Sequence, residues 1–200
     1  NSVDAPLWFF WCIQQYAYIN NARTEVWNLY SKVMKQILDT FAEGTDNVRM
    51  DSNYLLWQSQ SGKALTWMDA IVDGVPVTPR NGYAVEINAL WYNAVMFYRE
   101  LAELACSDGE SAKWDEFASV FPSSFKSTFW SKEKGYLADC VNGAERDFSV
   151  RCNMIFAVSM PYTCLSLKIR QLIVEKVKQE LLTPYGLRSL SPKAENYHPH

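Results

Sequence analysis

The chain has 200 residues, a formal net charge of −3 at pH 7 and 48% hydrophobic residues, a composition that favours a folded core over intrinsic disorder. No stretch concentrates lysine and arginine, and so we expect neither nucleic acid nor anionic lipid as a partner. The longest apolar run, residues 6–13, is far too short to span a bilayer, so no membrane partner is expected either.

Helical periodicity dominates the pattern of apolar residues. Asp4, followed by Ala5 and Pro6, predicts an N-cap and the start of a helix that runs to about residue 19. In residues 24–41, apolar residues recur at steps of three and four. This spacing predicts a second helix, which ends before Gly44.

The next segment, residues 45–82, holds Gly62, Gly74, Pro76 and Pro79 and reads as a long irregular loop. Loops of this length are uncommon inside a compact domain and are usually functional. We therefore look here first for binding or catalytic groups.

Helical periodicity returns in the second half of the chain. Residues 136–143, with Asn142-Gly143 as a turn, predict a small β-hairpin. Further helices are expected at about residues 85–105, 111–129, 151–160 and 165–182. Six helices, joined alternately by short and long connections, predict an all-α fold of stacked helical hairpins. From periodicity alone, the architecture is either a solenoid or a toroid.

The cysteines and histidines argue against a metal centre. The five cysteines contain no Cys-x-x-Cys pair, and both histidines, His198 and His200, stand at the C-terminal end. A zinc site and a cysteine–histidine nucleophile therefore lack their parts. An odd number of cysteines without close pairing favours buried free thiols in a reducing, cytoplasmic compartment.

One carboxylate in the long loop has apolar neighbours, because Asp69 directly follows Trp67 and Met68. An acid beside an indole and a thioether is desolvated, which raises its pKa and lets it hold a proton near neutral pH. A glycosidase needs such a group to protonate the leaving oxygen. The alternative is a solvated loop aspartate without a chemical role.

Three more polar residues follow at the end of the loop and in the third helix. Glu86 lies in the first turn of that helix, where the helix dipole favours a carboxylate for structural reasons alone. Arg80 can pair with a carboxylate or present a guanidinium fork to ligand hydroxyls, and Asn88 can offer an amide to a sugar. From the residues alone, the sequence indicates a helical domain with a polar and aromatic loop.

Six blocks of sequence resemble, in the same order, the amylo-α-1,6-glucosidase domain of the glycogen debranching enzyme family. The block with Thr66-Trp67-Met68-Asp69, followed by the block of residues 85–93, is specific rather than a chance pattern. The blocks are residues 1–10 (NSVDAPLWFF), 65–70 (LTWMDA), 77–82 (VTPRNG), 85–93 (VEINALWYN), 153–159 (NMIFAVS) and 182–191 (LTPYGLRSLS).

The resemblance implies a fold, an activity and a set of site residues. It implies a glucoamylase-like (α/α)₆ toroid, of which a single partial domain over residues 1–200 would supply about six of twelve helices. The implied activity is inverting removal of α-1,6-linked glucose from a branched α-glucan such as glycogen or limit dextrin, without metal or organic cofactor. Asp69 is the implied general acid, and Asp4 the residue that holds hydroxyls of the terminal glucose. The implied neighbours of the sugar are Trp67, Arg80, Glu86 and Asn88.

Two departures from the family pattern carry consequences. Tyr83 stands where the family often has lysine, and the chain ends at His200, before the family's His-Gln-Gly-Thr-Val-Trp segment and its glutamate base. The 200-residue chain is therefore expected to be an incomplete site that is inactive by itself. Two alternatives remain: another α/α-toroid glycosidase of trehalase or glucoamylase type, and a noncatalytic glycan-binding helical domain.

Overall fold

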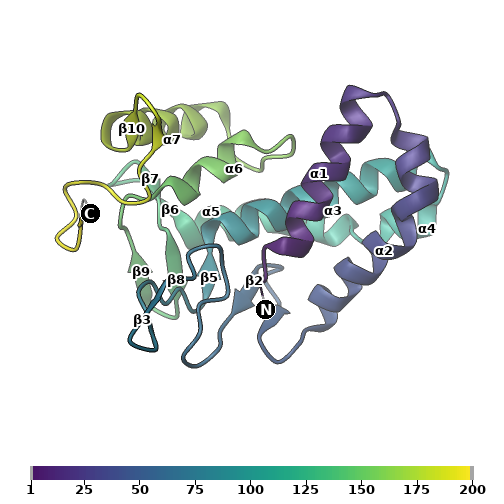
Figure 1. Cartoon of the computed structure of the whole chain (residues 1–200). Coiled ribbons are helices and arrows are strands. Elements are labelled where there is room, and N and C mark those ends of the chain that lie inside the picture. Colours follow the sequence, from purple (N-terminus) through teal and green to yellow (C-terminus); the bar gives the residue numbers. More distant parts are fainter. Residues whose placement is uncertain (1, 199–200) are drawn as a thin grey trace.

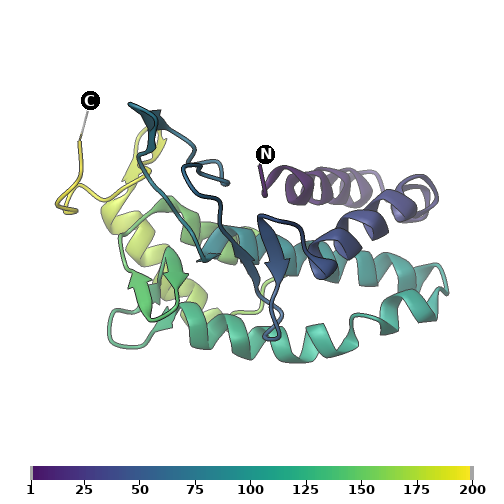
Figure 2. The same cartoon turned by 90° about the horizontal axis from the view of Figure 1, so that it is seen from below.

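The computed structural model describes residues 2–198, so that Asn1, Pro199 and His200 lie outside the described part. About 50% of the chain is helical and 14% is in strands. Most of the strands and the C-terminal tail lie toward one end of the molecule, α1, α2 and α4 lie toward the other, and β2 lies between them near the N-terminus (Figure 1). The view turned by 90° shows the same separation (Figure 2).

The helix α3 (Val85–Leu104) forms the centre of the core. It contacts α1 (Ala5–Ile19), α2 (Arg23–Glu43), α4 (Asp108–Ala112) and α5 (Asp115–Phe129). Residues on nearly all of its faces are buried, as expected for a helix enclosed by its neighbours rather than one lying on a surface.

The helix α5 places one aromatic ring on each successive turn. The ring centroids of Phe117 and Phe121 are 4.9 Å apart, and those of Phe125 and Phe129 are 4.8 Å apart. Residues spaced by four lie on one face of a helix, so these rings form a continuous apolar column. Pro122 lies within α5 without ending it. Much of the aromatic content therefore serves the core.

The remaining helices are short except for the last. A 3₁₀ turn, η1 (Cys152–Ile155), leads into α6 (Phe156–Ser159), and α7 (Leu167–Glu180) packs against this pair through Ile173 and Val177. The helix positions expected from apolar periodicity are confirmed, with the expected fourth helix divided into α4 and α5 and the fifth into η1 and α6.

The expectation of an all-α fold is wrong. In residues 2–198, short strands pair into five small antiparallel sheets, and the partial toroid expected with the all-α class is withdrawn with it. Strands of two or three residues are too short to show alternation, and β5 pairs with β8 far along the chain, so local sequence cannot reveal them. The strands are β1 (Val48–Met50), β2 (Leu56–Gln58), β3 (Ile71–Val72), β4 (Val75–Pro76), β5 (Tyr83–Ala84), β6 (Trp130–Ser131), β7 (Tyr136–Leu137), β8 (Cys140–Asn142), β9 (Glu145–Asp147), β10 (Leu182–Thr183) and β11 (Gly186–Leu187).

Two expectations about local structure have mixed outcomes. The expected hairpin is confirmed as β8–β9, although the long loop is less irregular than expected because it contains the β1–β2 and β3–β4 hairpins. All five cysteines are free, but Cys12 and Cys106 are exposed rather than buried. Within residues 2–198, no helix combines the length and apolarity needed to cross a membrane.

Gly82 connects the long loop to the three-stranded sheet. Its backbone exchanges two hydrogen bonds with Gln58, and its φ is +110°. A Cβ atom at this position would lie 2.2 Å from the carbonyl oxygen of Val141, which belongs to β8. The close approach of the two backbones therefore requires glycine.

We expect Gly82→Ala to lower the free energy of unfolding by roughly 3 kcal/mol or more, because backbone strain and a backbone clash add together. Urea unfolding measures the change. Gly74→Ala is the matched control, since Gly74 also has a positive φ but no neighbour within 4 Å, and it should cost only about 1–2 kcal/mol. Equal losses for both variants would contradict the close approach.

Candidate functional site

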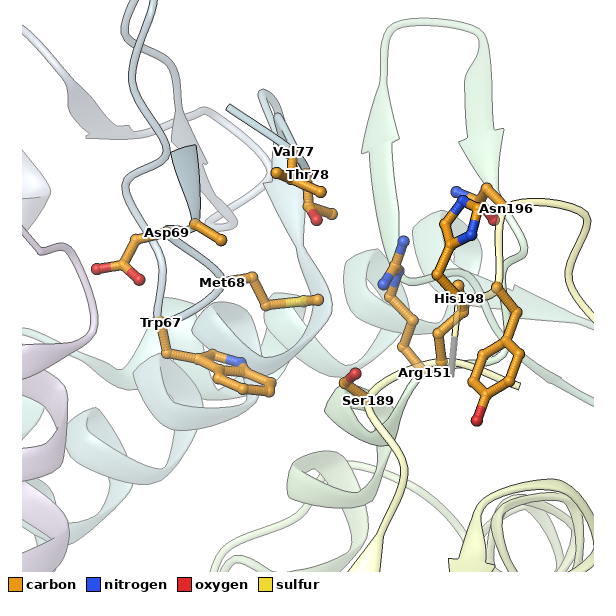
Figure 3. A pocket seen from close by; sticks show the side chains of 12 residues that line it. Trp67, Met68, Asp69, Val77, Thr78, Arg151, Ser189, Asn196 and His198 are labelled. Carbon is orange, nitrogen blue, oxygen red and sulfur yellow. The ribbon is translucent and has the colours of Figure 1, made fainter. Parts of the chain in front are cut away.

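A pocket of about 400 Å³ opens between residues 66–78 and the C-terminal tail (Figure 3). Arg151, which immediately precedes η1, lies between these two segments. The lining residues are Trp67, Met68, Asp69, Ala70, Val77, Thr78, Arg151, Ser189, Leu190, Asn196, Tyr197 and His198.

Asp69 lies at one edge of this pocket. Its carboxylate is exposed and points away from Met68 and Arg151 (Figure 3). Asp69 also lines an adjoining pocket of about 290 Å³ together with Ser2 and Thr66. The apolar enclosure expected from the neighbouring Trp67 and Met68 is therefore absent, and the carboxylate reaches solvent between two pockets.

Trp67 is fixed in place although its ring is 43% exposed. The indole Nε1–H donates a hydrogen bond of 2.9 Å to Oδ1 of Asn153. The amide of Asn153 donates in turn to Oδ1 of Asp139 at 2.7 Å and contacts the sulfur of Met68 at 3.3 Å. One buried amide thus holds two consecutive side chains of the loop, and leaves the indole face available to a ligand.

Arg80 lies behind the loop, nearly fully buried, and each of its N–H groups has an acceptor. The guanidinium makes a two-pronged contact with Glu86, including Nη2 to Oε2 at 2.6 Å. Nε donates to Oδ2 of Asp139 at 2.7 Å, and the remaining N–H groups reach Thr66 Oγ1 at 3.3 Å and the Asp139 carbonyl at 3.0 Å. No donor of Arg80 remains for a ligand.

Burial and ion pairing act in opposite directions in this cluster. Burial disfavours the charge of Arg80, but the carboxylates of Glu86 and Asp139 outweigh that effect and raise its pKa. Burial also disfavours the charge of Asp139 and thereby raises the pKa of this carboxyl group to about 6, although the positive charge of Arg80 partly opposes the shift. Asp139 is therefore the carboxyl in this cluster whose charge changes in mildly acidic solution.

Asn88 and Asp4 also have internal partners. Asn88 is fully buried, where its amide donates to the carbonyls of Leu56 and Ala84 and accepts from the Leu56 N–H at 2.8 Å. Asp4 occupies the N-cap position of α1, but its side chain makes no capping bond and instead accepts from the hydroxyl of Ser2. The expected capping bond is therefore absent.

The structure brings together only part of the expected site. Trp67 and Asp69 line one pocket, and Asp4 contacts Ser2, which lines the adjoining one. Arg80 and Glu86 lie behind the loop, and Asn88 ties α3 to β2. Arg80, Glu86 and Asn88 line neither pocket beside Asp69, and their contacts support the loop from behind.

Sequence reasoning missed Arg151, Asp139 and Asn153. Asn153 opens one of the blocks that carry the family resemblance, and Arg151 stands two residues before it, so that block was a usable signal. Asp139 has no such signal, because only the β7–β8 connection brings it to Arg80. Among residues 2–198, no three His, Cys, Asp or Glu side chains gather closely enough to hold a metal ion.

Comparisons with known proteins identify what the chain resembles. A family model described as amylo-alpha-1,6-glucosidase matches residues 1–200. The glycogen debranching enzyme of Saccharomyces cerevisiae is 25% identical in an alignment that covers 68% of this chain. The alignment covers 11% of the yeast protein, so the chain spans about a tenth of that relative's length.

The fold is shared with a solved structure from a glycosidase family. The GH78 family rhamnosidase of Bacillus sp. GL1 superposes with a TM-score of 0.59 at 17% identity, over 92% of this chain and 18% of that one. At this identity, the likeness concerns the arrangement of helices and small sheets alone.

The raised pKa of Asp139 has a testable consequence for titration and for stability. We expect its side-chain ¹³C signal to titrate with a midpoint near 6, and the signal to be absent in Asp139→Asn. Because the folded pKa exceeds the unfolded value, the contribution to stability is fully present below about pH 4 and is lost as the pH rises through 6. A midpoint near 4 would contradict the effect of burial.

Proposed function

The chain belongs to the amylo-alpha-1,6-glucosidase family, and from this membership we propose that the protein removes α-1,6-linked glucose at the branch points of a glycogen-type glucan. In this proposal Asp69 is the general acid. The substrate is a branched α-glucan, and neither metal nor organic cofactor takes part.

The observation that supports the proposal most directly is the position of Asp69. Among the described residues that line the 400 Å³ pocket, it is the one carboxylate, and it stands two residues from the half-exposed ring of Trp67. Aromatic faces suit the apolar C–H surfaces of a sugar ring. A glucosyl unit placed on Trp67 would therefore lie near Asp69, whose carboxyl group stands at the edge shared by the two adjoining pockets.

Inverting hydrolysis assigns different tasks to two carboxyl groups. The acid protonates the leaving oxygen, here O6 of the main-chain glucose, while a base activates water on the opposite face of the ring, roughly 6.5–9.5 Å from the acid. The carboxylates of Glu86 and Asp139 are buried and bonded to Arg80, so neither is free to activate water. The proposal accordingly assigns the base to a residue other than these two.

A second candidate function is noncatalytic glycan binding. The exposure of Asp69 and the lack of a second carboxylate around the pocket, within residues 2–198, favour it. A binding module needs the aromatic face and hydrogen-bonding groups but no acid and base. The two functions differ in whether replacement of Asp69 changes turnover or only affinity.

We expect Asp69→Asn to lower kcat on α-1,6-linked glucose stubs by about 10²–10⁴-fold, with little change in affinity, because the amide has no proton to give to the leaving oxygen. Glucose release from limit dextrin by the full-length protein measures this. Asp73→Asn is the control, since Asp73 is an exposed aspartate of the same segment that lines neither pocket, and it should leave turnover unchanged. If Asp69→Asn turns over like the wild type, Asp69 is not the acid.

A further inference from the structure

Arg151 is a buried arginine whose head group faces the pocket. Its side chain is only 8% exposed, and it lines the 400 Å³ pocket directly before η1. The N–H of Ser191 donates to the carbonyl of Val150 at 2.9 Å, which holds the C-terminal tail against the residue preceding Arg151. The side chain is therefore enclosed by the fold, while its tip faces the space between the loop and the tail.

Within the described residues, Nε of Arg151 has no hydrogen-bond partner. The nearest carboxylate oxygen, Oδ2 of Asp139, lies 3.7 Å from it, which is beyond hydrogen-bonding distance. That oxygen already accepts from Nε of Arg80 at 2.7 Å. Arg151 is thus attracted by the charge of Asp139 without being satisfied by it, in contrast to Arg80, whose N–H groups all have acceptors.

A buried guanidinium whose hydrogen-bonding capacity is not met by protein groups is costly. Nε itself is fully buried, so an acceptor from outside would reach the Nη groups at the tip of the side chain. Figure 3 shows the guanidinium in the gap between Val77 and Thr78 on one side and Asn196 and His198 on the other. Asp69 stands across the pocket from it. The carboxylate of Asp69 points away from Arg151, so a ligand in this space meets the donors of the guanidinium without a facing carboxylate.

The surroundings of Arg151 favour one class of ligand. The charge of its guanidinium is already opposed by Asp139, whose Oδ2 lies 3.7 Å from Nε, so Arg151 needs hydrogen-bond acceptors rather than a second counter-charge. A neutral polyol has hydroxyl groups that accept from a guanidinium and bring no further charge. The planar fork of arginine also matches two neighbouring oxygen atoms, which the adjacent hydroxyls of a hexose provide.

We propose that Arg151 is a substrate-binding residue that donates to two adjacent hydroxyl groups of the glucosyl unit in this pocket. The proposal rests on the proposed function, because it takes the occupant of the pocket to be an α-glucan. A site built to hydrogen-bond a hydroxyl group rejects analogues that lack it, so Arg151 would contribute to sugar specificity as well as to affinity.

The test measures binding of isomaltose, an α-1,6-linked disaccharide, to the full-length protein by titration calorimetry. Arg151→Met removes the donors, and Arg151→Lys keeps the charge beside Asp139 but loses the planar fork. Each variant is expected to bind isomaltose roughly 10- to 100-fold more weakly, the loss expected for hydrogen bonds from a charged donor. Arg146→Met is the control, since Arg146 is an exposed arginine of β9, and its affinity should equal that of the wild type.

Thermal unfolding separates binding from a structural role. Because Nε has no hydrogen-bond partner and Asp139 keeps its bond to Arg80, Arg151→Met should lower the melting temperature only slightly while its affinity falls. A lowered melting temperature with unchanged affinity, in either Arg151 variant, would overturn the proposal. If Arg151→Met does not fold, the affinity of Arg151→Lys decides, and wild-type affinity in that variant counts against the proposal.

A set of methyl isomaltosides, each lacking one hydroxyl group, identifies the contact. We expect two of these analogues to bind the wild-type protein more weakly than the parent methyl isomaltoside does. The same two analogues should bind Arg151→Met with the same affinity as the parent sugar. Analogues that lose affinity equally for both proteins would show that Arg151 touches no hydroxyl group, and would overturn the proposal.

The outcome also distinguishes this inference from the proposed function. If the full-length wild type releases no glucose from limit dextrin while the Arg151 variants lose isomaltose affinity, the hydrolytic function fails and Arg151 stands as a glycan-binding residue. If the wild type hydrolyses limit dextrin but the Arg151 variants bind isomaltose normally, only the role of Arg151 fails.

Discussion

The buried ion pairs of Arg80 constrain the rest of the structure. A guanidinium out of contact with water must have its charge balanced and its donors satisfied, and Glu86 and Asp139 do both. The contacts connect the two ends of residues 66–80, the first turn of α3 and the turn before β8. Removal of one partner from such a cluster typically costs about 3–5 kcal/mol, because a buried charge then remains uncompensated.

This cluster explains how a surface loop can present ordered side chains. Thr66 and Arg80 are joined directly, so residues 67–79 leave the core and return to it at nearly the same place. Asn153 adds a second attachment from η1, through the indole of Trp67. A ligand that binds beside Trp67 thus meets a side chain already held in position, which reduces the entropy lost on binding.

Two arginines of the same region differ in how many of their N–H groups have acceptors within the protein. We assign the one with all its donors used to support of the loop, and the other to ligand binding. Arg80 and Arg151 both approach Oδ2 of Asp139, at 2.7 and 3.7 Å. The closer one uses its donors on protein groups, whereas the farther one faces the pocket with Nε unsatisfied within residues 2–198. A single buried carboxylate therefore fixes one guanidinium and leaves the other available.

Local sequence was sufficient for the helices and for the family. The apolar spacing predicted α1, α2 and α3 to within a few residues, because a helix that packs on a core repeats its apolar residues at a fixed period. The family followed from short blocks such as residues 65–70, which a family match over the whole chain confirms. Apart from the β8–β9 hairpin, the small sheets were not predicted, since pairing of strands as short as β5 and β8 depends on distant segments.

The roles of individual side chains also depend partly on local sequence and partly on contacts between distant segments. The sequence by itself placed Asp69 and Trp67 side by side in the long loop, because this depends only on local order along the chain, whereas the pocket beside them came from the structure. It did not show that Arg80, Glu86 and Asn88 turn toward internal partners, or that Arg151 turns toward the pocket. Only the tertiary structure decided this, because a polar side chain faces a ligand or the core according to which acceptors other segments bring within hydrogen-bonding distance.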